Sequence, residues 1–588
     1  MAAPDVAPAP DVMPAPDVTS PPDAAPAPDV MPAPDVTSPA DLAPHPPHVP
    51  HAPHAAPETV PPQDSRGFLA KAAFLTAGLS VAGAGLGLVR DQALARLFGA
   101  GADTDAFLVA WTVPEFAATL LIEDGLAFAL VPAFSLALAQ RARGAAGDPV
   151  RALVVGTLPR LALALVAVAV LAVVAAPHLV AALAPGLDDR ALAVDCTRLT
   201  ATCLLSFGLA GYASAALRAH RRFLAPAGIY VAYNTAVITA MLLLGGGWGV
   251  RSAAVGVAVG GLLMVAVQLP VLWRRLREGA DVVGAAPGSP AAPTRVGLAL
   301  VGTVLLFALC RQSQVLIERF LASHLPAGAI SHLNYAQKVA QLPMTLSLML
   351  CTVTFPVVAR ALAEGDTARA RERVQRDLAL AACVVLAGAS VVVACAPQII
   401  EVLFQRGAFT ARDTAATASV MRVYALGLLG QTLVGALVRC YFGAGRPTWY
   451  PLAAMAVGIV TTAWLGTWAV GPWGTAGIAA ANAAGITATA ALLLAGARPG
   501  GPSGVVPLRR RAVLAELGRP VWAAVAATAA GACAADWPGS AVLGLAAGAV
   551  TVAVVYVPLG RALGDRGCAL AVTSLRSAIR RLPYVRSR

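Results

Sequence analysis

The sequence has few charged residues for its length. Only 13% of its 588 residues are charged, whereas 58% are hydrophobic. Soluble globular domains carry about 25% charged residues. The composition therefore excludes an ordinary soluble domain and indicates a protein with many membrane-spanning segments.

Sequence signatures of catalysis and of metal binding are missing. We find no Ser, His and Asp arrangement, no Walker-type loop and no metal-ligand spacing, and therefore expect a non-enzyme that needs no cofactor and no metal. The nine cysteines lie mostly within apolar runs and show no CxxC spacing. We interpret them as small core side chains rather than as disulfides or metal ligands. No cleavable signal peptide precedes the first apolar span, which begins near Phe68.

The net charge of +12 would suggest a nucleic-acid partner in a soluble chain. Here the arginines cluster in alternate loops between apolar runs, where positive charge sets the orientation of the spans. We therefore expect no nucleic acid and place both termini in the cytoplasm. The clusters contain Arg141, Arg143 and Arg151; Arg218, Arg221 and Arg222; Arg274, Arg275 and Arg277; Arg360, Arg369, Arg371, Arg373 and Arg376; Arg439 and Arg446; and Arg509, Arg510 and Arg511.

Residues 1–65 form a tail rich in Pro, Ala and Asp, in which the segment Ala7 to Pro21 recurs unchanged from Ala25 to Pro39. Such low-complexity composition predicts a disordered tail. Its histidines are spaced by three, which aligns them on one face of a polyproline II helix; they are His45, His48, His51 and His54. Metal capture by these side chains is an alternative, but an inert linker is the better interpretation, because the tail offers no folded second shell.

Apolar windows long enough to cross a bilayer follow one another from Phe68 onward, and we count about fourteen. The second and eighth are long and contain prolines, so we expect them to be bent or broken at Pro114, Pro132, Pro343 and Pro356. The windows are 68–89, 104–139, 152–174, 197–217, 226–246, 252–273, 296–320, 327–359, 378–396, 415–438, 450–469, 473–496, 515–535 and 539–560.

Two matching segments indicate an internal duplication. VVAAPHLVAAL with Pro177 resembles VVACAPQIIEVL with Pro397, and the ends of the fourth and tenth windows resemble each other at nearly the same offset. We predict an all-α polytopic membrane protein with two parallel six-helix repeats and two C-terminal helices. The expected parts are the tail 1–65, the N-lobe 66–278, a cytoplasmic linker 279–295, the C-lobe 296–497, a basic linker 498–514, and the last two spans with a basic tail 515–588.

Polar side chains form a stripe on one face of the eighth window, where Asn334, Gln337, Lys338 and Gln341 recur at helical spacing. Lipid cannot solvate that face, so it must meet protein or a watery cavity. Lys338 has no acidic residue at helical spacing on its own helix. We expect this stripe to line a pocket for an anion, and the alternative is hydrogen bonding between helices.

A second stripe lies in the seventh window and contains Arg311, Gln314 and Glu318, with Arg319 beside it. Arg311 is a second candidate for the anion pocket, and the alternative is a pair with Glu318. Arg319 lies near the end of its window, where a long side chain can reach the interface, so pocket and interface are about equally good interpretations.

Acidic residues also occur in the second window, where Asp105 and Glu115 share a face. Asp105 can pair with Arg90 or Arg96, or it can hold a cation. Pairing with an arginine is the better prediction, because an unpaired charge is expensive within a membrane.

The segments VRDQALARLFGAGADTDAFLVA, FLASHLPAGAISHLNYAQKVAQLP, TFPVVARAL and VLFQRGAFT together resemble the lipid II flippase family, MurJ or MviN, of the multidrug/oligosaccharidyl-lipid/polysaccharide exporter superfamily. The resemblance implies a fourteen-helix transporter of the bacterial inner membrane, with two six-helix lobes and two extra helices that form a lipid-facing groove. Its implied cargo is lipid II, the undecaprenyl-pyrophosphate disaccharide-pentapeptide, for peptidoglycan synthesis.

The resemblance also assigns site residues. The family's basic residue after the first span corresponds to Arg90, its TDAF aspartate to Asp105, and the arginine of its eighth helix to Lys338. The sequence departs from the family where arginines are common, with Ala84, Ala118 and Thr119 in their place, and the EGA turn reads Glu123, Asp124 and Gly125.

The polar stripes and the resemblance together give the complete set of substrate-binding candidates: Arg90, Asp105, Arg311, Lys338, Arg319, Gln337 and Gln341.

The expected function is therefore export of lipid II by alternating access, with membrane lipid and a monovalent cation as further partners. Within transport, the alternatives are a paralogous exporter of another polyprenyl-pyrophosphate saccharide and a cation-coupled drug antiporter. The excess of intramembrane basic residues argues against the antiporter. A membrane scaffold that transports nothing is the alternative from a different class.

Overall fold

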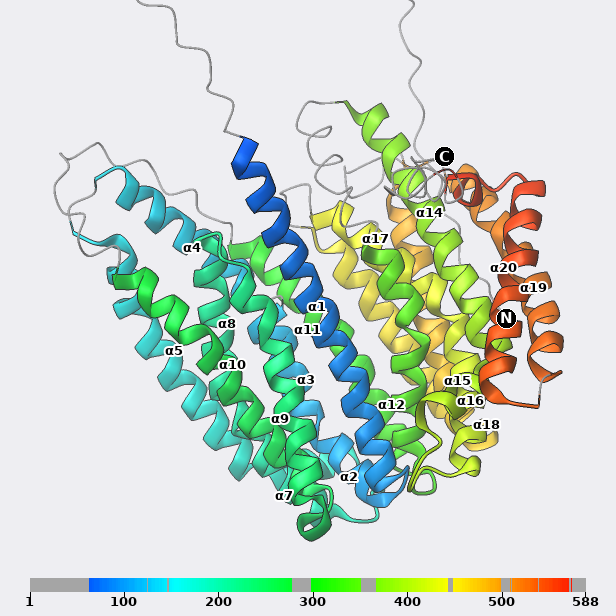
Figure 1. Cartoon of the computed structure of the whole chain (residues 1–588), viewed down its shortest axis with the longest axis horizontal. Helices are drawn as coiled ribbons and strands as arrows, with labels where there is room; N and C mark the ends of the chain where they lie inside the picture. Colours follow the sequence, from blue (N-terminus) through cyan, green and yellow to red (C-terminus); the bar gives the residue numbers. More distant parts are fainter. Residues whose placement is uncertain are drawn as a thin grey trace, which may run out of the picture. The chain divides into compact units, whose positions relative to one another are not determined.

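The computed structural model describes residues 63–123, 125–144, 147–277, 298–349, 366–442, 448–498, 508, 510–537, 539–570 and 573. The predicted tail up to residue 62, the linker 279–295 and Pro356 lie outside these residues. Every regular element in the described part is a helix, which confirms the predicted all-α fold (Figure 1).

The helices of the first repeat are α1 Gln63–Phe98, α2 Ala102–Ala110, α3 Thr112–Ala117, the π-helix η1 Ala118–Glu123, α4 Gly125–Ala142, α5 Pro149–Val174, α6 Ala176–Leu183, α7 Arg190–Ala201, α8 Cys203–Ala219, α9 Leu224–Trp248 and α10 Arg251–Arg277. Those that follow are α11 Leu298–Ala322, α12 Ala329–Ala340, α14 Thr367–Ala394, α15 Ala396–Phe404, α16 Ala411–Leu426, α17 Leu428–Phe442, α18 Tyr450–Gly496, α19 Arg510–Asp536 and α20 Ala541–Ala562. The helix α19 begins at Arg510, within the predicted basic linker 498–514.

Several of these helices can cross a membrane. By length and composition, eight helical segments of the described chain qualify, and nine if the bent pair α16 and α17 forms one span. One of the eight, α18, contains two predicted windows joined at the non-helical Gly474. The polytopic membrane fold is therefore confirmed, while the count of fourteen stays a prediction.

Large apolar side chains point outward along these segments. Leu163 of α5 is 72% exposed, Leu243 of α9 is 77% exposed and Trp522 of α19 is 70% exposed. In water such surfaces would promote aggregation, whereas lipid tails solvate them. The outer faces of the helices are therefore suited to the hydrocarbon core of a bilayer.

The predicted repeat is visible in the breaks between helices. The chain leaves α5 at Ala175 and enters α6 with Pro177 in its first turn, and it leaves α14 at Cys395 and enters α15 with Pro397 in its first turn. Proline suits the first turn of a helix, because its missing N–H would have no partner there. Equivalent prolines therefore start equivalent short helices in the two halves.

A second pair of helix breaks was not predicted from the sequence. Trp248 and Gly249 end α9, and Trp473 and Gly474 interrupt α18. Gly249 has φ 56° and ψ −142°, and Gly474 has φ 55° and ψ −133°. Side chains other than that of glycine strongly disfavour this conformation. The same Trp-Gly corner thus turns the chain between the last two helices of each repeat.

The proline predictions for the two long windows are partly confirmed. The second window breaks at Trp111, three residues before Pro114, and the eighth breaks at Gln341, two residues before Pro343. Pro132 lies inside α4, which continues across it without a break, and a bend at this position stays a prediction. A proline within a membrane helix is tolerated when neighbouring groups satisfy the backbone carbonyl that it leaves free.

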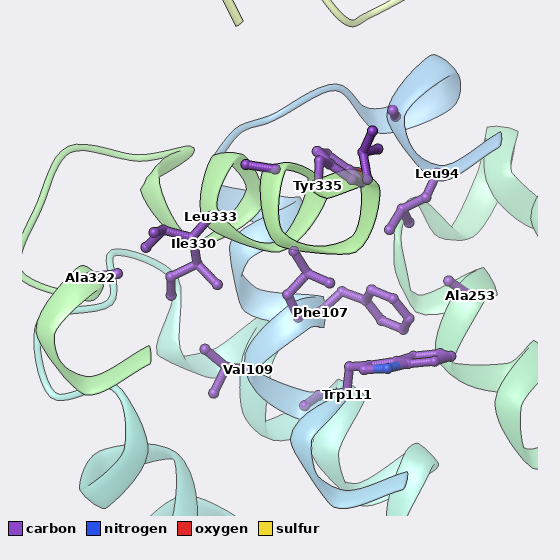
Figure 2. Packing of buried hydrophobic residues seen from close by; sticks show 14 of the residues in the cluster. Leu94, Phe107, Val109, Trp111, Ala253, Ala322, Ile330, Leu333 and Tyr335 are labelled. Atoms are coloured by element: carbon purple, nitrogen blue, oxygen red, sulfur yellow. The ribbon is translucent and has the colours of Figure 1, made fainter. Parts of the chain in front are cut away.

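The largest apolar core surrounds α2 (Figure 2). Phe107 of α2 and Trp111, which follows that helix, pack in one core with Leu333 of α12 and Ala253 of α10, so both repeats contribute. Elsewhere α1 packs along α9, α11 packs along α18, and α19 and α20 pack together against α14. The core around α2 fixes the segment that carries most of the predicted site.

We predict that Gly249→Ala destabilises the protein by about 1–3 kcal/mol, because the backbone there has a conformation that only glycine adopts readily. No atom lies within 4 Å of the added methyl group, so strain is the only cost. The control is Gly247→Ala, which also meets open space but lies within α9. It should be neutral or stabilising. Thermal unfolding in detergent would measure both variants, and equal midpoints would contradict the prediction.

Candidate functional site

The two repeats meet at a group of charged side chains, which we call the cation cluster and define as Arg90, Asp91 and Lys338 with the ring of Trp111. Arg90 and Asp91 lie in the last third of α1, and Lys338 lies in the last turn of α12. Trp111 stands at the break between α2 and α3. Helices far apart in the chain therefore supply one site.

Asp91 holds both cations of this cluster. Its carboxylate accepts hydrogen bonds from Arg90 Nη2 at 2.7 Å and Arg90 Nε at 3.0 Å, and its Oδ2 lies 3.3 Å from Lys338 Nζ. The Asp91 side chain is 8% exposed and that of Lys338 is 30% exposed. The cluster thus combines two positive charges with one negative charge, which leaves one positive charge in excess.

The ring of Trp111 and the side-chain amide of Asn234 also contact the cations of the cluster. The guanidinium of Arg90 lies 4.4 Å from the centroid of Trp111, and Lys338 Nζ lies 5.7 Å from it. Arg90 Nη1 also donates to Asn234 Oδ1 at 3.1 Å, and Asn234 Nδ2 donates to the carbonyl of Gly83 at 3.0 Å. The ring attracts both cations without neutralising them. The ring therefore leaves the excess positive charge of the cluster unchanged.

The cation cluster faces a small cavity of about 10 Å³. This is about the space that one water molecule needs. The cavity is lined by Arg90, Asp91, Leu94, Phe107, Leu108, Trp111, Val237, Met241, Ala253 and Lys338. In this conformation the site is closed around its charges, and any larger ligand requires the repeats to move apart.

The prediction that Lys338 is free of an acidic partner was wrong, because helical spacing within α12 gives no information about α1. Asp91 is the partner, 247 positions away. Sequence reasoning gave Asp91, Trp111 and Asn234 no role in the site. Only Asp91 carried a signal, since it directly follows Arg90.

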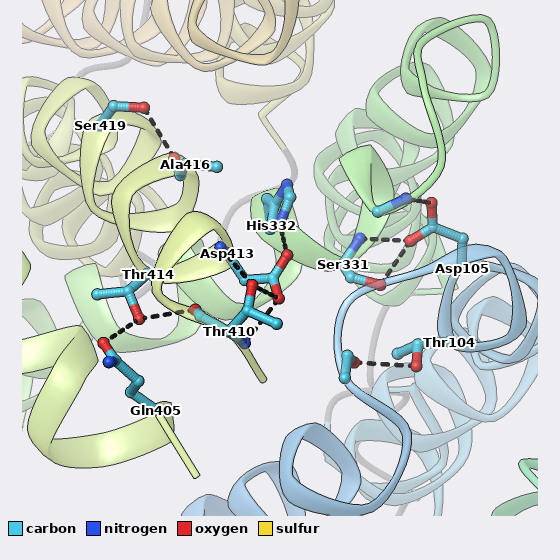
Figure 3. Close-up of polar contacts among 12 residues, drawn as sticks. Thr104, Asp105, Ser331, His332, Gln405, Thr410, Asp413, Thr414, Ala416 and Ser419 are labelled. Carbon is cyan, nitrogen blue, oxygen red and sulfur yellow. Dashed lines mark hydrogen bonds and ion pairs between the residues drawn. The ribbon is translucent and has the colours of Figure 1, made fainter. Parts of the chain in front are cut away.

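Asp105 does not pair with Arg90 or Arg96, so that prediction was also wrong. Its carboxylate accepts from the backbone N–H of Gly328 at 2.7 Å, from the N–H of Ser331 at 2.7 Å and from the Ser331 hydroxyl (Figure 3). These donors lie at the N-terminus of α12, where a helix attracts negative charge. Asp105 thus joins α2 of the first repeat to α12 of the second.

Backbone contacts reinforce this junction, which we call the latch and define as Asp105, Gly328 and Ser331 with the Arg96–Ala408 contact. The Ala408 N–H donates to the Arg96 carbonyl at 2.9 Å. A methyl group on Gly407 would lie 2.3 Å from that carbonyl, so only glycine permits the approach. His332 Nε2 lies 3.2 Å from Asp413, which connects α12 to the start of α16 (Figure 3).

The arginines of α11 occupy two different environments. Arg319 is 5% exposed and its guanidinium lies 3.3 Å from Glu115 of α3, so the interpretation that its side chain reaches the interface was wrong. Glu318 accepts from Asn482, so the alternative of a pair with Arg311 was wrong. Arg311 is exposed and forms no ion pair within the described part of the chain.

Gln337 lies on α12 beside Lys338, Gln341 follows the last residue of that helix, and both are half-buried. Neither side chain lines the cavity or forms a hydrogen bond with a described residue. The structure thus brings Arg90 and Lys338 together at one cavity, and it places the other predicted site residues outside the lining.

Comparisons with known proteins agree on one family. The sequence model described as "Lipid II flippase MurJ" matches residues 94–535. The lipid II flippase MurJ of Burkholderia cenocepacia is 29% identical over 383 residues, covering 64% of this chain and 73% of that protein. The probable lipid II flippase MurJ of Thermotoga maritima is 28% identical over 364 residues, covering 60% and 70%.

Solved structures show the same fold. The structure of "Lipid II flippase MurJ, inward closed conformation" superposes with a TM-score of 0.66 at 17% identity, covering 83% of this chain and 98% of that one. An inward-facing multidrug resistance MATE transporter superposes with a TM-score of 0.56 at 14% identity, covering 71% and 96%. At these identities the likeness concerns the fold alone.

We predict that Asp105→Ala opens the latch, because it leaves the donors of Gly328 and Ser331 without their acceptor. Each lost partner of a buried donor costs about 1–3 kcal/mol. A cysteine introduced at Ala329 should therefore react at least about tenfold faster with a maleimide in this variant. The matched control is Asp103→Ala, because Asp103 lies in the same helix turn but is exposed. Equal rates in the two variants, measured by peptide mass spectrometry, would show that Asp105 does not hold the repeats together.

Proposed function

Because the chain belongs to the MurJ family of lipid II flippases, we propose that it moves lipid II from the cytoplasmic to the outer leaflet of the bacterial inner membrane. The observation that carries this proposal is the pair Arg90 and Lys338, contributed by different repeats and facing one cavity. A pyrophosphate group carries several negative charges through a region of low dielectric. Arginine and lysine replace its lost water with charge-assisted hydrogen bonds.

Asp91 gives the closed cavity an internal substitute for the phosphate. It satisfies both cations in the absence of cargo, so neither positive charge is left unpaired in the membrane. When a pyrophosphate enters, its oxygens take over the contacts that Asp91 makes with Arg90 and Lys338. Because the cations keep an anionic partner throughout this exchange, they are never left both unpaired and stripped of water.

Alternating access follows from the position of the latch. The latch lies where α1 ends and α12 begins. With the amino terminus in the cytoplasm, as the arginine clusters favour, this end faces the outer side. The latch therefore closes the outer side, and its release lets the repeats rock apart there. The polyprenyl tail stays in lipid, so only the head group enters the cavity.

The two alternative transport functions differ in their support. An exporter of another polyprenyl-pyrophosphate saccharide would use the same cations, and it is favoured by the absence of arginine at Ala84, Ala118 and Thr119. A cation bound at Asp105 is disfavoured, because the carboxylate already accepts from three N–H and O–H donors. A coupling cation at another site remains part of the proposal.

The proposal is tested by expressing the chain in a cell depleted of its own flippase. We expect growth and surface labelling of lipid II to be restored. Absence of both, with the protein inserted at a normal level, would overturn the proposal. Purified protein should also bind lipid II more tightly than other polyprenyl-pyrophosphate saccharides, and the reverse order would favour the rival exporter.

We further predict that Lys338 is the most damaging single cation to lose. Lys338→Ala removes a phosphate contact, which costs about 1.5–3 kcal/mol and weakens lipid II binding roughly tenfold to a hundredfold. Arg319→Ala should have a smaller effect, because Arg319 is engaged with Glu115 outside the cavity lining. Lys338→Arg should retain most activity, since it keeps the charge. Binding and complementation at matched membrane levels measure all three variants.

If Lys338→Ala binds lipid II and complements like the parent protein, the cation cluster is not the phosphate site. The polar stripe of α12 would then serve contacts between helices.

A further inference from the structure

The chain folds back after α20 and packs on α14. We call residues 563–570 the C-terminal hook. Arg519 of α19 donates to the Gly564 carbonyl at 3.0 Å, and Gly564 has a positive φ of 75° that allows the reversal. A methyl group on Gly567 would lie 2.5 Å from the Ala379 carbonyl of α14. The hook is thus held in direct contact with α14.

This contact brings together two cysteines that are 185 positions apart. The sulfurs of Cys383 on α14 and Cys568 in the hook lie 3.4 Å apart, and the residues are 4% and 1% exposed. Asp565, at the start of the hook, is 2% exposed. One ligand atom from each of the three residues lies within 4.8 Å of the others. Sequence spacing gave no sign of this group.

The Asp565 carboxylate has no cationic partner among the described residues. It accepts from the N–H groups of Gly567 at 2.9 Å and Cys568 at 3.1 Å, which leaves lone pairs on both oxygens. The nearby arginines, Arg519 and Arg566, pair with Glu516 instead. Apolar side chains surround the two cysteines. A buried charge in such a place normally has a partner or binds a metal.

We propose that Cys383, Cys568 and Asp565 form a binding site for Zn²⁺ or a similar thiophilic divalent cation. Two sulfurs bound to one tetrahedral Zn²⁺ at about 2.3 Å lie about 3.8 Å apart, so the observed 3.4 Å needs little adjustment. A water molecule can supply the fourth ligand. The metal crosslinks the hook to α14 and so connects α20 to the second repeat.

Charge balance supports a metal at this position. The two thiols release one proton each when the cation binds, because the thiolate is the ligand. The two positive charges of the metal replace these two protons. The net charge of the buried group is therefore the same before and after binding, and the apolar surroundings do not oppose the exchange.

The depth of the site favours metal binding over a disulfide. The basic segment of α14 runs from Arg369 to Arg376, and Cys383 lies seven residues, or about 10 Å, beyond it. With the arginine-rich ends of the helices in the cytoplasm, the cysteines lie near a reducing compartment that keeps thiols free.

The full-length protein, purified under reducing conditions, is the material for the test, and Cd²⁺ and Zn²⁺ are the probes. Cadmium should produce a thiolate charge-transfer band in the ultraviolet that saturates at one equivalent. Zinc should displace the cadmium and so abolish the band. The band should vanish in Cys383→Ser and in Cys568→Ser. Asp565→Asn should weaken binding at least about tenfold, because it removes a charged ligand. The matched control is Cys440→Ser, which should leave the band unchanged.

A second measurement on the natural chain guards against misfolded variants. Zinc should protect Cys383 and Cys568 from a membrane-permeable maleimide, and a chelator should restore their reaction, as read by peptide mass spectrometry. Equal alkylation with and without zinc would overturn the proposal. In protein purified without reductant, alkylation only after reductant is added would also overturn it and would identify the pair as a disulfide. A band that persists in the variant lacking both cysteines would locate the metal elsewhere.

Discussion

The pairing of charge within a membrane is the constraint on which this structure depends. Arg90 and Lys338 lie in helices of a membrane-spanning fold, where an isolated charge is strongly unfavourable. Asp91 relieves that cost for both at once, because its carboxylate contacts the arginine and the lysine together. Since Arg90 and Asp91 belong to α1 and Lys338 belongs to α12, this electrostatic requirement also joins the two repeats. Transport needs that junction to be reversible, and the proposed exchange of Asp91 for a phosphate would make it so.

The helix α12 connects the junction to the latch. Its first turn receives the Asp105 carboxylate at Ser331, and its last turn carries Lys338, seven residues or about 10 Å further on. A single rigid helix therefore contacts the first repeat at both of its ends. Movement of α12 changes both contacts together, whereas a flexible loop would let them change independently. The break at Gln341, beside Pro343, separates this short helix from the helical residues that follow. It can therefore move without carrying the whole span.

The sequence predicted local features and missed long-range partners. Apolar windows, the prolines of the first turns and the resemblance to a family identified the fold, because each depends on neighbouring residues or on a recognisable motif. The partner of Lys338 lies 247 positions away and the partner of Asp105 lies 226 positions away. Helical spacing cannot reveal such pairs, since they depend on how helices pack. Arg319 illustrates the same limit: its place near the end of a window suggested water, but Glu115 of α3 covers it.

The closed cavity carries more positive than negative charge. Its lining contains two cations and one acid, so one excess positive charge must be tolerated without cargo. Each added arginine would raise that excess and would need its own partner in the closed state. Thr119, which stands where an arginine is common, donates its hydroxyl to the Glu115 carbonyl within the π-helical turn and carries no charge. Under the proposed function, a cavity with fewer cations would hold its cargo by fewer contacts and would close more easily after the cargo has left. Lower affinity for the head group is then the expected counterpart of a closed state in which Asp91 leaves only one positive charge in excess.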